Sequence, residues 1–184
     1  REERAERVYR ALADVRLTLP EEIGRSYPHL LSGGQRQRVS IARALVLRPD
    51  YIVADEAVSM VDASSRVEIL ALLKSLQEAY GIAFLYITHD IATARYFAHR
   101  IAVMYLGHIV EVGSPAQVIE TPLHPYTQAL VAAVPEPDPA NRLRERPTVP
   151  GEPPNPLAMP PGCPFHPRCP SFIRGTCEVA RPVL

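Results

Sequence analysis

The sequence predicts an α/β protein in which buried parallel strands are joined by crossover helices and are followed by an irregular, proline-rich extension. Short apolar runs alternate with helix-length segments over roughly the first 134 residues, which is the pattern of a parallel sheet. Of the 20 prolines, three precede residue 115 and 14 fall between residues 135 and 184. No helix or central strand tolerates that density, because proline lacks a backbone donor.

Three helices and two parallel strands are expected in order along the first part. Helical spacing of apolar residues predicts helices over 2–15, 33–47 and 62–79. The apolar runs 51–54 and 82–87 are the expected strands, and residues 101–112 predict a hairpin that closes the sheet. Ligands of open parallel sheets bind beyond the carboxyl ends of the strands. The residues that follow the two strands are therefore candidates for the site: Asp55, Glu56, Thr88, His89 and Asp90.

Composition and charge exclude some classes of function. The chain has 20 basic and 20 acidic side chains and a net charge of zero, which argues against binding to nucleic acid, since that binding needs clustered Lys and Arg. No apolar run approaches the roughly 20 residues that cross a bilayer, and no secretory signal is visible at the start. Three cysteines do not make a secreted disulfide scaffold. A cytoplasmic location is expected.

The first candidate motif is Leu31-Ser32-Gly33-Gly34-Gln35, which precedes a predicted helix. Two glycines let a ligand approach the backbone, and the free N–H groups of a helix start favour a phosphate. A capping box, with Ser32 at the cap and Gln35 three residues later, explains the same residues without a ligand. The residues alone leave both interpretations open. The basic residues behind the motif are expected on a solvated helix face: Arg36, Arg38 and Arg43.

The second candidate motif is the strand that ends in Asp55-Glu56. A carboxylate just past a buried strand can hold a hydrated Mg²⁺ through water, and its neighbour can orient an attacking water in phosphoryl transfer. Both residues could equally end a strand or cap the following turn. His89 could contact a terminal phosphate oxygen, although a single histidine is more often structural.

In order and spacing, residues 31–35, 51–56, 59–62 and 88–90 resemble the signature loop, Walker B strand, D-loop and switch histidine of the ATP-binding subunits of ABC transporters. The resemblance implies a P-loop NTPase-type fold with part of its parallel sheet and helical subdomain. It also implies ATP and Mg²⁺ as cofactors. By the resemblance, Asp55 serves the magnesium, Glu56 is the general base, His89 senses the γ-phosphate and Asp62 couples two subunits. The signature residues would bind the γ-phosphate of ATP held by the opposite subunit: Ser32, Gly33, Gly34 and Gln35.

Two departures and one absence accompany the resemblance. Ala57 stands where the family usually has proline, and Met60-Val61 replaces the commoner Ala-Leu, but neither change removes a reacting group. These 184 residues contain no Gly-x-x-x-x-Gly-Lys-Ser/Thr loop, which would cradle the β- and γ-phosphates. The chain therefore resembles the carboxyl-terminal portion of such a subunit, and we expect it to bind ATP weakly or not at all on its own. The expected parts are the end of the helical subdomain with the signature helix (1–48), part of the RecA-like core (49–134) and an extension (135–184).

The proline-rich extension indicates a particular branch of this family. Residues 124–130, 134–139 and 162–170, together with Cys177, are similar to the C-terminal extension of oligopeptide and dipeptide import ATPases. The resemblance implies a head-to-tail dimer with a second, identical or different ATPase at the cytoplasmic face of the membrane. It also implies two membrane permeases as partners, fed by an extracytoplasmic peptide-binding protein. A nickel-importer ATPase, and a truncated or non-hydrolytic module for interaction or metal binding, are the alternatives.

The three cysteines of the extension allow two explanations. Cys163, Cys169 and Cys177 could coordinate an iron–sulfur cluster or zinc, with His166 or a cysteine outside this segment as the fourth ligand. They could also be three reduced structural thiols. Some peptide-importer ATPases carry an iron–sulfur cluster in this extension. The resemblance therefore implies a cluster here, whereas the cysteine spacing alone does not establish one. Apart from metal, the extension could be ordered by packing of three side chains against the ATPase domain: Phe165, Phe172 and Leu184.

Overall fold

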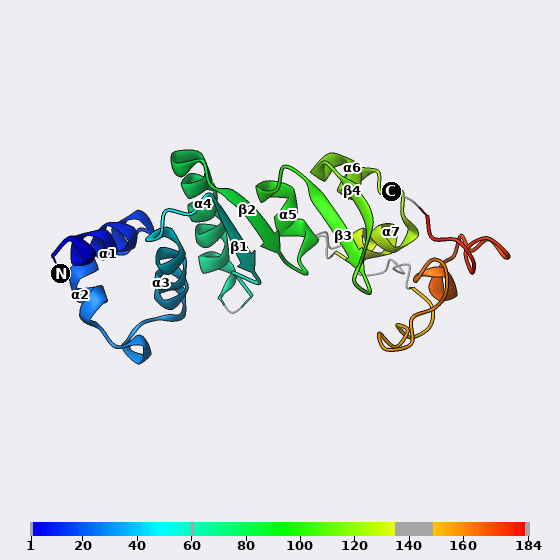
Figure 1. Ribbon diagram of the computed structural model, residues 1–184, viewed down its shortest axis with the longest axis horizontal. Coiled ribbons are helices and arrows are strands. Elements are labelled where there is room, and N and C mark those ends of the chain that lie inside the picture. Colours follow the sequence, from blue (N-terminus) through cyan, green and yellow to red (C-terminus); the bar gives the residue numbers. More distant parts are fainter. Residues whose placement is uncertain (1, 60, 135–148, 183–184) are drawn as a thin grey trace, which may run out of the picture. The chain divides into compact units, whose positions relative to one another are not determined.

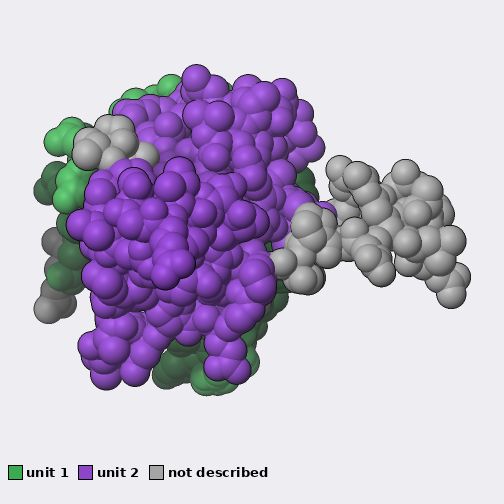
Figure 2. Space-filling view, turned by 90° about the vertical axis from the view of Figure 1, so that its right-hand side faces the viewer, with its two compact units in different colours: residues 1–89 green, residues 90–184 purple. Residues whose placement is uncertain are grey.

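A computed structural model describes residues 2–59, 61–134 and 149–182 of the chain. The chain divides into two compact units, residues 1–89 and 90–184, and the described residues of each unit form a two-stranded sheet (Figures 1 and 2). Met60 of the D-loop, residues 135–139 of the extension motif and Leu184 lie outside the described residues. The three-part division at residues 48 and 134 remains a prediction.

The first unit contains the expected helices and parallel strands (Figure 1). Strands β1 (Tyr51–Asp55) and β2 (Ala83–Ile87) pair in parallel, with Tyr51 opposite Ala83 and Asp55 opposite Ile87. All predicted ends agree with the structure to within two residues, while one short helix and one 3₁₀ turn were not predicted. The helices are α1 (Glu2–Asp14), α2 (Pro20–Arg25), α3 (Gly33–Leu45) and α4 (Ala63–Tyr80), with the 3₁₀ turn η1 (Pro28–Leu30).

The core of the first unit depends on α4, which buries one apolar stripe. Ile69, Leu72, Leu73 and Leu76 recur at helical spacing and are all buried. Burying side chains of this size stabilises a fold by about 1.5–3 kcal/mol each. The stripe therefore accounts for much of the stability of this unit.

Among the described residues, the expectation of buried parallel strands holds for one face of the sheet and not for the other. Successive strand residues point to opposite faces. Along the face that carries Ala54, the side chains are buried or half-buried. The opposite face has no cover among the described residues, and its apolar side chains are exposed: Tyr51, Val53, Leu85 and Ile87.

The second unit contains the predicted hairpin. Strands β3 (Ile101–Tyr105) and β4 (His108–Gly113) are antiparallel, with a register irregularity between Val103 and Met104. The hairpin forms a sheet of its own, so the prediction that it closes the parallel sheet is wrong for the described strands. An apolar pattern specifies the buried face of a hairpin but not which strand its outer edge meets. Helices α5 (Ile91–Phe97), α6 (Pro115–Glu120) and α7 (Pro125–Ala132) complete this unit, with a 3₁₀ turn, η3 (His166–Arg168), in the extension.

The described part of the extension, residues 149–182, is irregular as predicted and is held by aromatic packing. Phe165 is 0% exposed, and its ring lies 5.2 Å from that of Tyr105 and 5.5 Å from that of Tyr126, measured between centroids. The packing role predicted for Phe165 is confirmed. The role predicted for Phe172 gains no support, because that ring is 39% exposed and lies against His166 of the extension itself.

A tight backbone approach closes the extension on itself. The N–H of Cys163 donates to the carbonyl oxygen of Cys177 at 2.9 Å. Gly162, at φ 68°, lies so close to the backbone of Cys177 and Glu178 that a β-carbon would clash with it. In the described ranges, no helix combines the length and the apolar character needed to cross a bilayer.

Candidate functional site

Parallel pairing brings the carboxyl ends of β1 and β2 together, as expected from the sequence. Nδ1 of His89 lies 2.8 Å from Oε1 of Glu56, although 33 residues separate them in the chain. The pairing of Asp55 with Ile87 sets this distance, because Glu56 and His89 follow those positions closely. Both side chains remain substantially open to solvent. This edge therefore presents a solvent-accessible carboxylate and imidazole within hydrogen-bond distance of each other.

The backbone of Glu56 is held in an unusual conformation. Its φ is 50°, in the left-handed region that costs energy for residues other than glycine. Its N–H donates to the carbonyl oxygen of Ile87 at 2.9 Å, and its own carbonyl accepts from the N–H and the hydroxyl of Ser59. These bonds turn the chain sharply at the strand end and hold the Glu56 side chain toward His89.

Asp55 ends β1 as an exposed side chain. A lone exposed carboxylate suits Mg²⁺, which keeps several of its waters and takes few protein ligands. Asp55 therefore fits the magnesium that the resemblance implies.

The segment Ser32–Gln35 forms the predicted capping box at the start of α3. The hydroxyl of Ser32 accepts from the N–H of Gln35 at 3.2 Å, and Oε1 of Gln35 accepts from the N–H of Ser32 at 2.9 Å. A β-carbon on Gly33 would meet nothing within 4 Å. The cap thus leaves open space beside the glycine backbone, and the two interpretations of this motif are compatible.

Asp62 is the N-cap of α4. Its carboxylate accepts hydrogen bonds from the hydroxyl of Ser64 and from both the N–H and the hydroxyl of Ser65. These bonds, that of Ser64 foremost, hold the pKa of Asp62 well below its usual range. A β-carbon on Gly34 would lie 3.7 Å from the Ser65 hydroxyl. The turn at Gly34 therefore lies near Ser65, which is bonded to Asp62.

Arg38 does not lie on a solvated face, contrary to the expectation for the basic residues of α3. Its side chain is 16% exposed and its Nη2 lies 2.7 Å from Oε2 of Glu68 on α4. Arg38 follows Gln35 by three residues, which places both on one face of the helix. That spacing does not reveal the contact with Glu68, which depends on how α3 and α4 lie.

The three cysteines of the extension are free thiols. Cys163 is buried, and burial raises the pKa of the Cys169 thiol. Within the described ranges no three His, Cys, Asp or Glu side chains are grouped so that they could hold a metal ion. The structure therefore gives no support to the predicted iron–sulfur cluster or zinc site at Cys163, Cys169 and Cys177.

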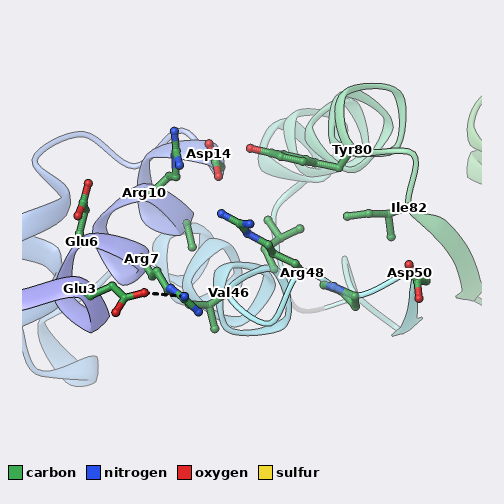
Figure 3. Close-up of a pocket in the computed structure, with 13 residues that line it drawn as sticks. Glu3, Glu6, Arg7, Arg10, Asp14, Val46, Arg48, Asp50, Tyr80 and Ile82 are labelled. Carbon is green, nitrogen blue, oxygen red and sulfur yellow. Dashed lines mark hydrogen bonds and ion pairs between the residues drawn. The ribbon is translucent and has the colours of Figure 1, made fainter. Parts of the chain in front are cut away.

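A separate cavity of about 740 Å³ lies between α1, the end of α3 and the end of α4 (Figure 3). Charges of both signs line it, including Arg10, Arg48 and Asp14. A hydrogen bond to Asp14 raises the pKa of Tyr80 at its rim. None of the predicted site residues lines this cavity.

Known protein families match both the first part of the chain and its C-terminal part. One family model, described as ABC transporter, matches residues 1–59, and another, described as oligopeptide/dipeptide transporter, C-terminal region, matches residues 110–177. A probable peptide ABC transporter ATP-binding protein of Sinorhizobium fredii is 51% identical over 89% of this chain and 46% of its own length. The dipeptide transport ATP-binding protein DppF of Escherichia coli is 45% identical over 100% of this chain and 54% of its own length. The chain thus spans about half the length of these relatives.

Solved structures give the same picture of the fold. The ATP-binding cassette MJ0796, in a dimeric post-hydrolysis structure bound to ADP and Pi, is 38% identical with a TM-score of 0.54. The match covers 62% of this chain and 48% of that one. The matching 62% of this chain therefore has part of an ATP-binding cassette fold.

Proposed function

This chain belongs to the ABC transporter ATP-binding proteins, in the branch that carries the oligopeptide/dipeptide transporter C-terminal region, and we propose that its full-length protein hydrolyses ATP to drive import of oligopeptides or dipeptides. The observation that carries the proposal is the 2.8 Å contact between Glu56 and His89 at the end of the parallel strands. In the proposed reaction the carboxylate serves as the general base and the histidine contacts the γ-phosphate.

Glu56 is the proposed general base. Its carboxylate orients a water molecule and accepts its proton as the water attacks the γ-phosphorus. His89 holds that carboxylate through Nδ1, and in the imidazolium form, in which both ring nitrogens carry a proton, its Nε2–H would donate to a γ-phosphate oxygen. Asp55 would hold Mg²⁺ through water, and the bound ion would supply neutralisation of the phosphate charge.

The signature turn is proposed to act on the nucleotide of a second ATPase subunit in a head-to-tail dimer. The backbone at Gly33 is open, and the start of α3 offers a helix dipole to a phosphate. Ser32 and Gln35 complete that surface with side-chain groups. Asp62 lies at the neighbouring start of α4, where it can transmit contact with the partner subunit.

Residues 1–184 alone are proposed to be inactive, because the phosphate-cradling loop is not among them. The uncovered sheet face of Val53 and Leu85 supports this, since apolar strand residues of this kind are covered in a complete parallel sheet. We expect no micromolar ATP affinity for the segment in calorimetry. Micromolar affinity would contradict the proposal for the segment and leave that for the full-length protein unchanged.

An apolar groove of about 460 Å³ between α1, α2 and α3 is the proposed contact with a permease. Val8, Leu12 and Val39 line it, and its charged lining residues are Arg36 and Arg43. Such a groove suits a short amphipathic helix of the permease that carries an acidic residue. Arg43→Glu is expected to weaken copurification with the permeases from membranes, and unchanged copurification would contradict this contact.

The test of the whole proposal uses the full-length subunit assembled with its partner ATPase and permeases. Ser32→Arg places a bulky cation at the signature turn and should abolish ATP turnover at the partner's nucleotide while leaving nucleotide binding at its own site intact. Ser171→Arg, at an exposed serine of the extension, is the matched control and should turn over normally. Loss of binding at the subunit's own site alone would contradict the head-to-tail arrangement, and absence of peptide-stimulated turnover in the wild type would contradict the function.

A further inference from the structure

Arg38 is held at two points between three parts of the first unit. Its Nη2 donates to Oε2 of Glu68 on α4 at 2.7 Å, and its Nη1 donates to the carbonyl oxygen of Val15 at 3.2 Å. Val15 directly follows α1 and is completely buried. One guanidinium therefore ties α3 to α4 and to the end of α1.

The contact with Val15 follows from the chemistry of helix ends. The last carbonyl groups of a helix lack partners within it, and a cation near them is favoured by the helix dipole. Arginine suits such a position because its fixed fork of donors serves two acceptors at once. A lysine could serve only one of them with the same geometry.

The Arg38–Glu68 pair lies beside a hollow rather than in a packed interface. A cavity of about 280 Å³ separates the signature turn from the start of α4, and Ser32, Gly34, Ser65, Glu68 and Arg38 itself are among its lining residues. Side chains that line a hollow do not hold two helices at one spacing by packing. Beside this cavity the Arg38–Glu68 bridge joins α3 to α4.

We propose that Arg38 is a positioning residue for ATP hydrolysis. Through Glu68 it holds the signature turn at a constant spacing from Asp62, so that both reach the opposite subunit's nucleotide together. The inference rests on the proposed function, in which these two segments face the partner. Arg38 itself touches no reacting atom in this scheme.

The chain provides a matched control for a simple stabilising ion pair. Arg7 and Glu3 also meet at 2.7 Å, but both side chains are well exposed on the same helix, α1. Exposed pairs of that kind contribute little. Arg7→Met removes the same charge without touching α3 or α4.

The experiment measures steady-state ATP turnover and melting temperature of the full-length subunit in its assembled transporter. The variants compared with the wild type are Arg38→Met, Arg38→Lys, Glu68→Gln, the Arg38→Met/Glu68→Gln double variant and Arg7→Met. We expect Arg38→Met to lower kcat about tenfold and leave KM for ATP within about twofold, as a coupling residue would. Glu68→Gln should lower kcat less, and the double variant should match Arg38→Met because the two effects share one bridge. Arg38→Lys should recover part of the loss, and Arg7→Met should behave as wild type.

The outcomes separate this inference from the function on which it rests. Unchanged kcat in Arg38→Met, or a lower melting temperature with full turnover below it, would overturn the positioning role. Additive losses in the double variant would overturn the role of Glu68. If the wild type turns over ATP and Ser32→Arg does not, the proposed function stands whatever Arg38 does. If the wild type itself is inactive, both fall.

Discussion

The two sheets of the molecule differ in what covers them. The β3–β4 hairpin buries Ile101, Val103 and Tyr105 against helices of its own unit and against Phe165 of the extension. The β1–β2 sheet leaves Val53 and Leu85 exposed on one face and presents Glu56 and His89 at its edge. Among the described residues, the chain therefore covers the β3–β4 sheet and leaves one face of the β1–β2 sheet open. The sheet whose edge carries the candidate site is thus the one with an open face.

Glu56→Gln should have the largest effect and should act on chemistry alone. The amide keeps the shape and the hydrogen bond to His89 but cannot accept the proton of water, so turnover should fall by about 10²–10⁴-fold. ATP should remain bound in the full-length transporter, with an unchanged melting temperature, as measured by turnover, nucleotide retention and scanning fluorimetry. Turnover within about threefold of wild type would mean that Glu56 is not the base.

Phe165→Ala should lower the stability of the unit that contains the β3–β4 sheet, whereas Glu56→Gln should change turnover and not stability. Removing a completely buried aromatic ring costs about 3–5 kcal/mol of unfolding free energy, because a cavity remains. Phe172→Ala is the control, and its partly exposed ring should cost less than about 1 kcal/mol. Urea unfolding of the second unit measures both. Equal effects at the two positions would mean that Phe165 does not hold the extension.

Leu85→Ala tests whether the exposed face of β1–β2 is covered in the complete protein. In residues 1–184 the change should cost under about 0.5 kcal/mol, because Leu85 is 59% exposed. In the full-length protein it should cost about 2 kcal/mol or more, as for a buried leucine. Leu72→Ala, at a completely buried position of α4, should be costly in both. An equally small effect of Leu85→Ala in both proteins would mean that this face stays uncovered.

Sequence patterns predicted the first unit better than the second for physical reasons. Helices α1, α3 and α4 have 13 to 18 residues, enough for a stripe of apolar positions to show. Helices α2, α5, α6 and α7 have six to eight residues, too few turns for periodicity. The start of α6 did have a local signal, since Ser114 and Gln117 form a capping box and Pro115 occupies the first helical position.

Motif order and spacing predicted the residues of the candidate site, whose catalytic and binding roles remain predictions, and predicted only some of their contacts. Motif order placed Glu56 and His89 at neighbouring strand ends, and the pairing of β1 with β2 brings them together. Spacing alone could not reveal that Arg38 meets Glu68, because 30 residues separate them and the bond depends on how two helices lie. For the cysteines, the residue type suggested a metal site, but the described residues contain no group of side chains that could hold a metal ion. The contacts that the structure shows for the extension are instead the aromatic packing around Phe165.

The smallest expected effect concerns the pH dependence of the covered sheet. His124 caps α7 by accepting the Tyr126 N–H at 3.1 Å, and its ring packs beside Phe165. Burial lowers the pKa of His124, and the nearby Glu111 opposes that shift only partly. Burial disfavours the Glu111 carboxylate, yet bonds from the N–H groups of Leu123 and His124 keep its pKa below the usual value, so it stays ionised near neutral pH.

A histidine whose pKa is lower in the folded state binds its proton more readily in the unfolded state. Stability is therefore complete above the unfolded pKa, near 6.5, and falls as the pH decreases from there toward the lower folded value. Since the ring is half exposed, the loss should stay below about 1 kcal/mol. His124→Asn keeps an acceptor at the cap and removes the titration, so the melting temperature should fall less between pH 7.5 and 5.5 than in the wild type, and comparison of the two isolates His124 from the other histidines. Parallel pH profiles would show that protonation of His124 does not oppose docking of the extension, and that this aromatic cluster tolerates a charged ring.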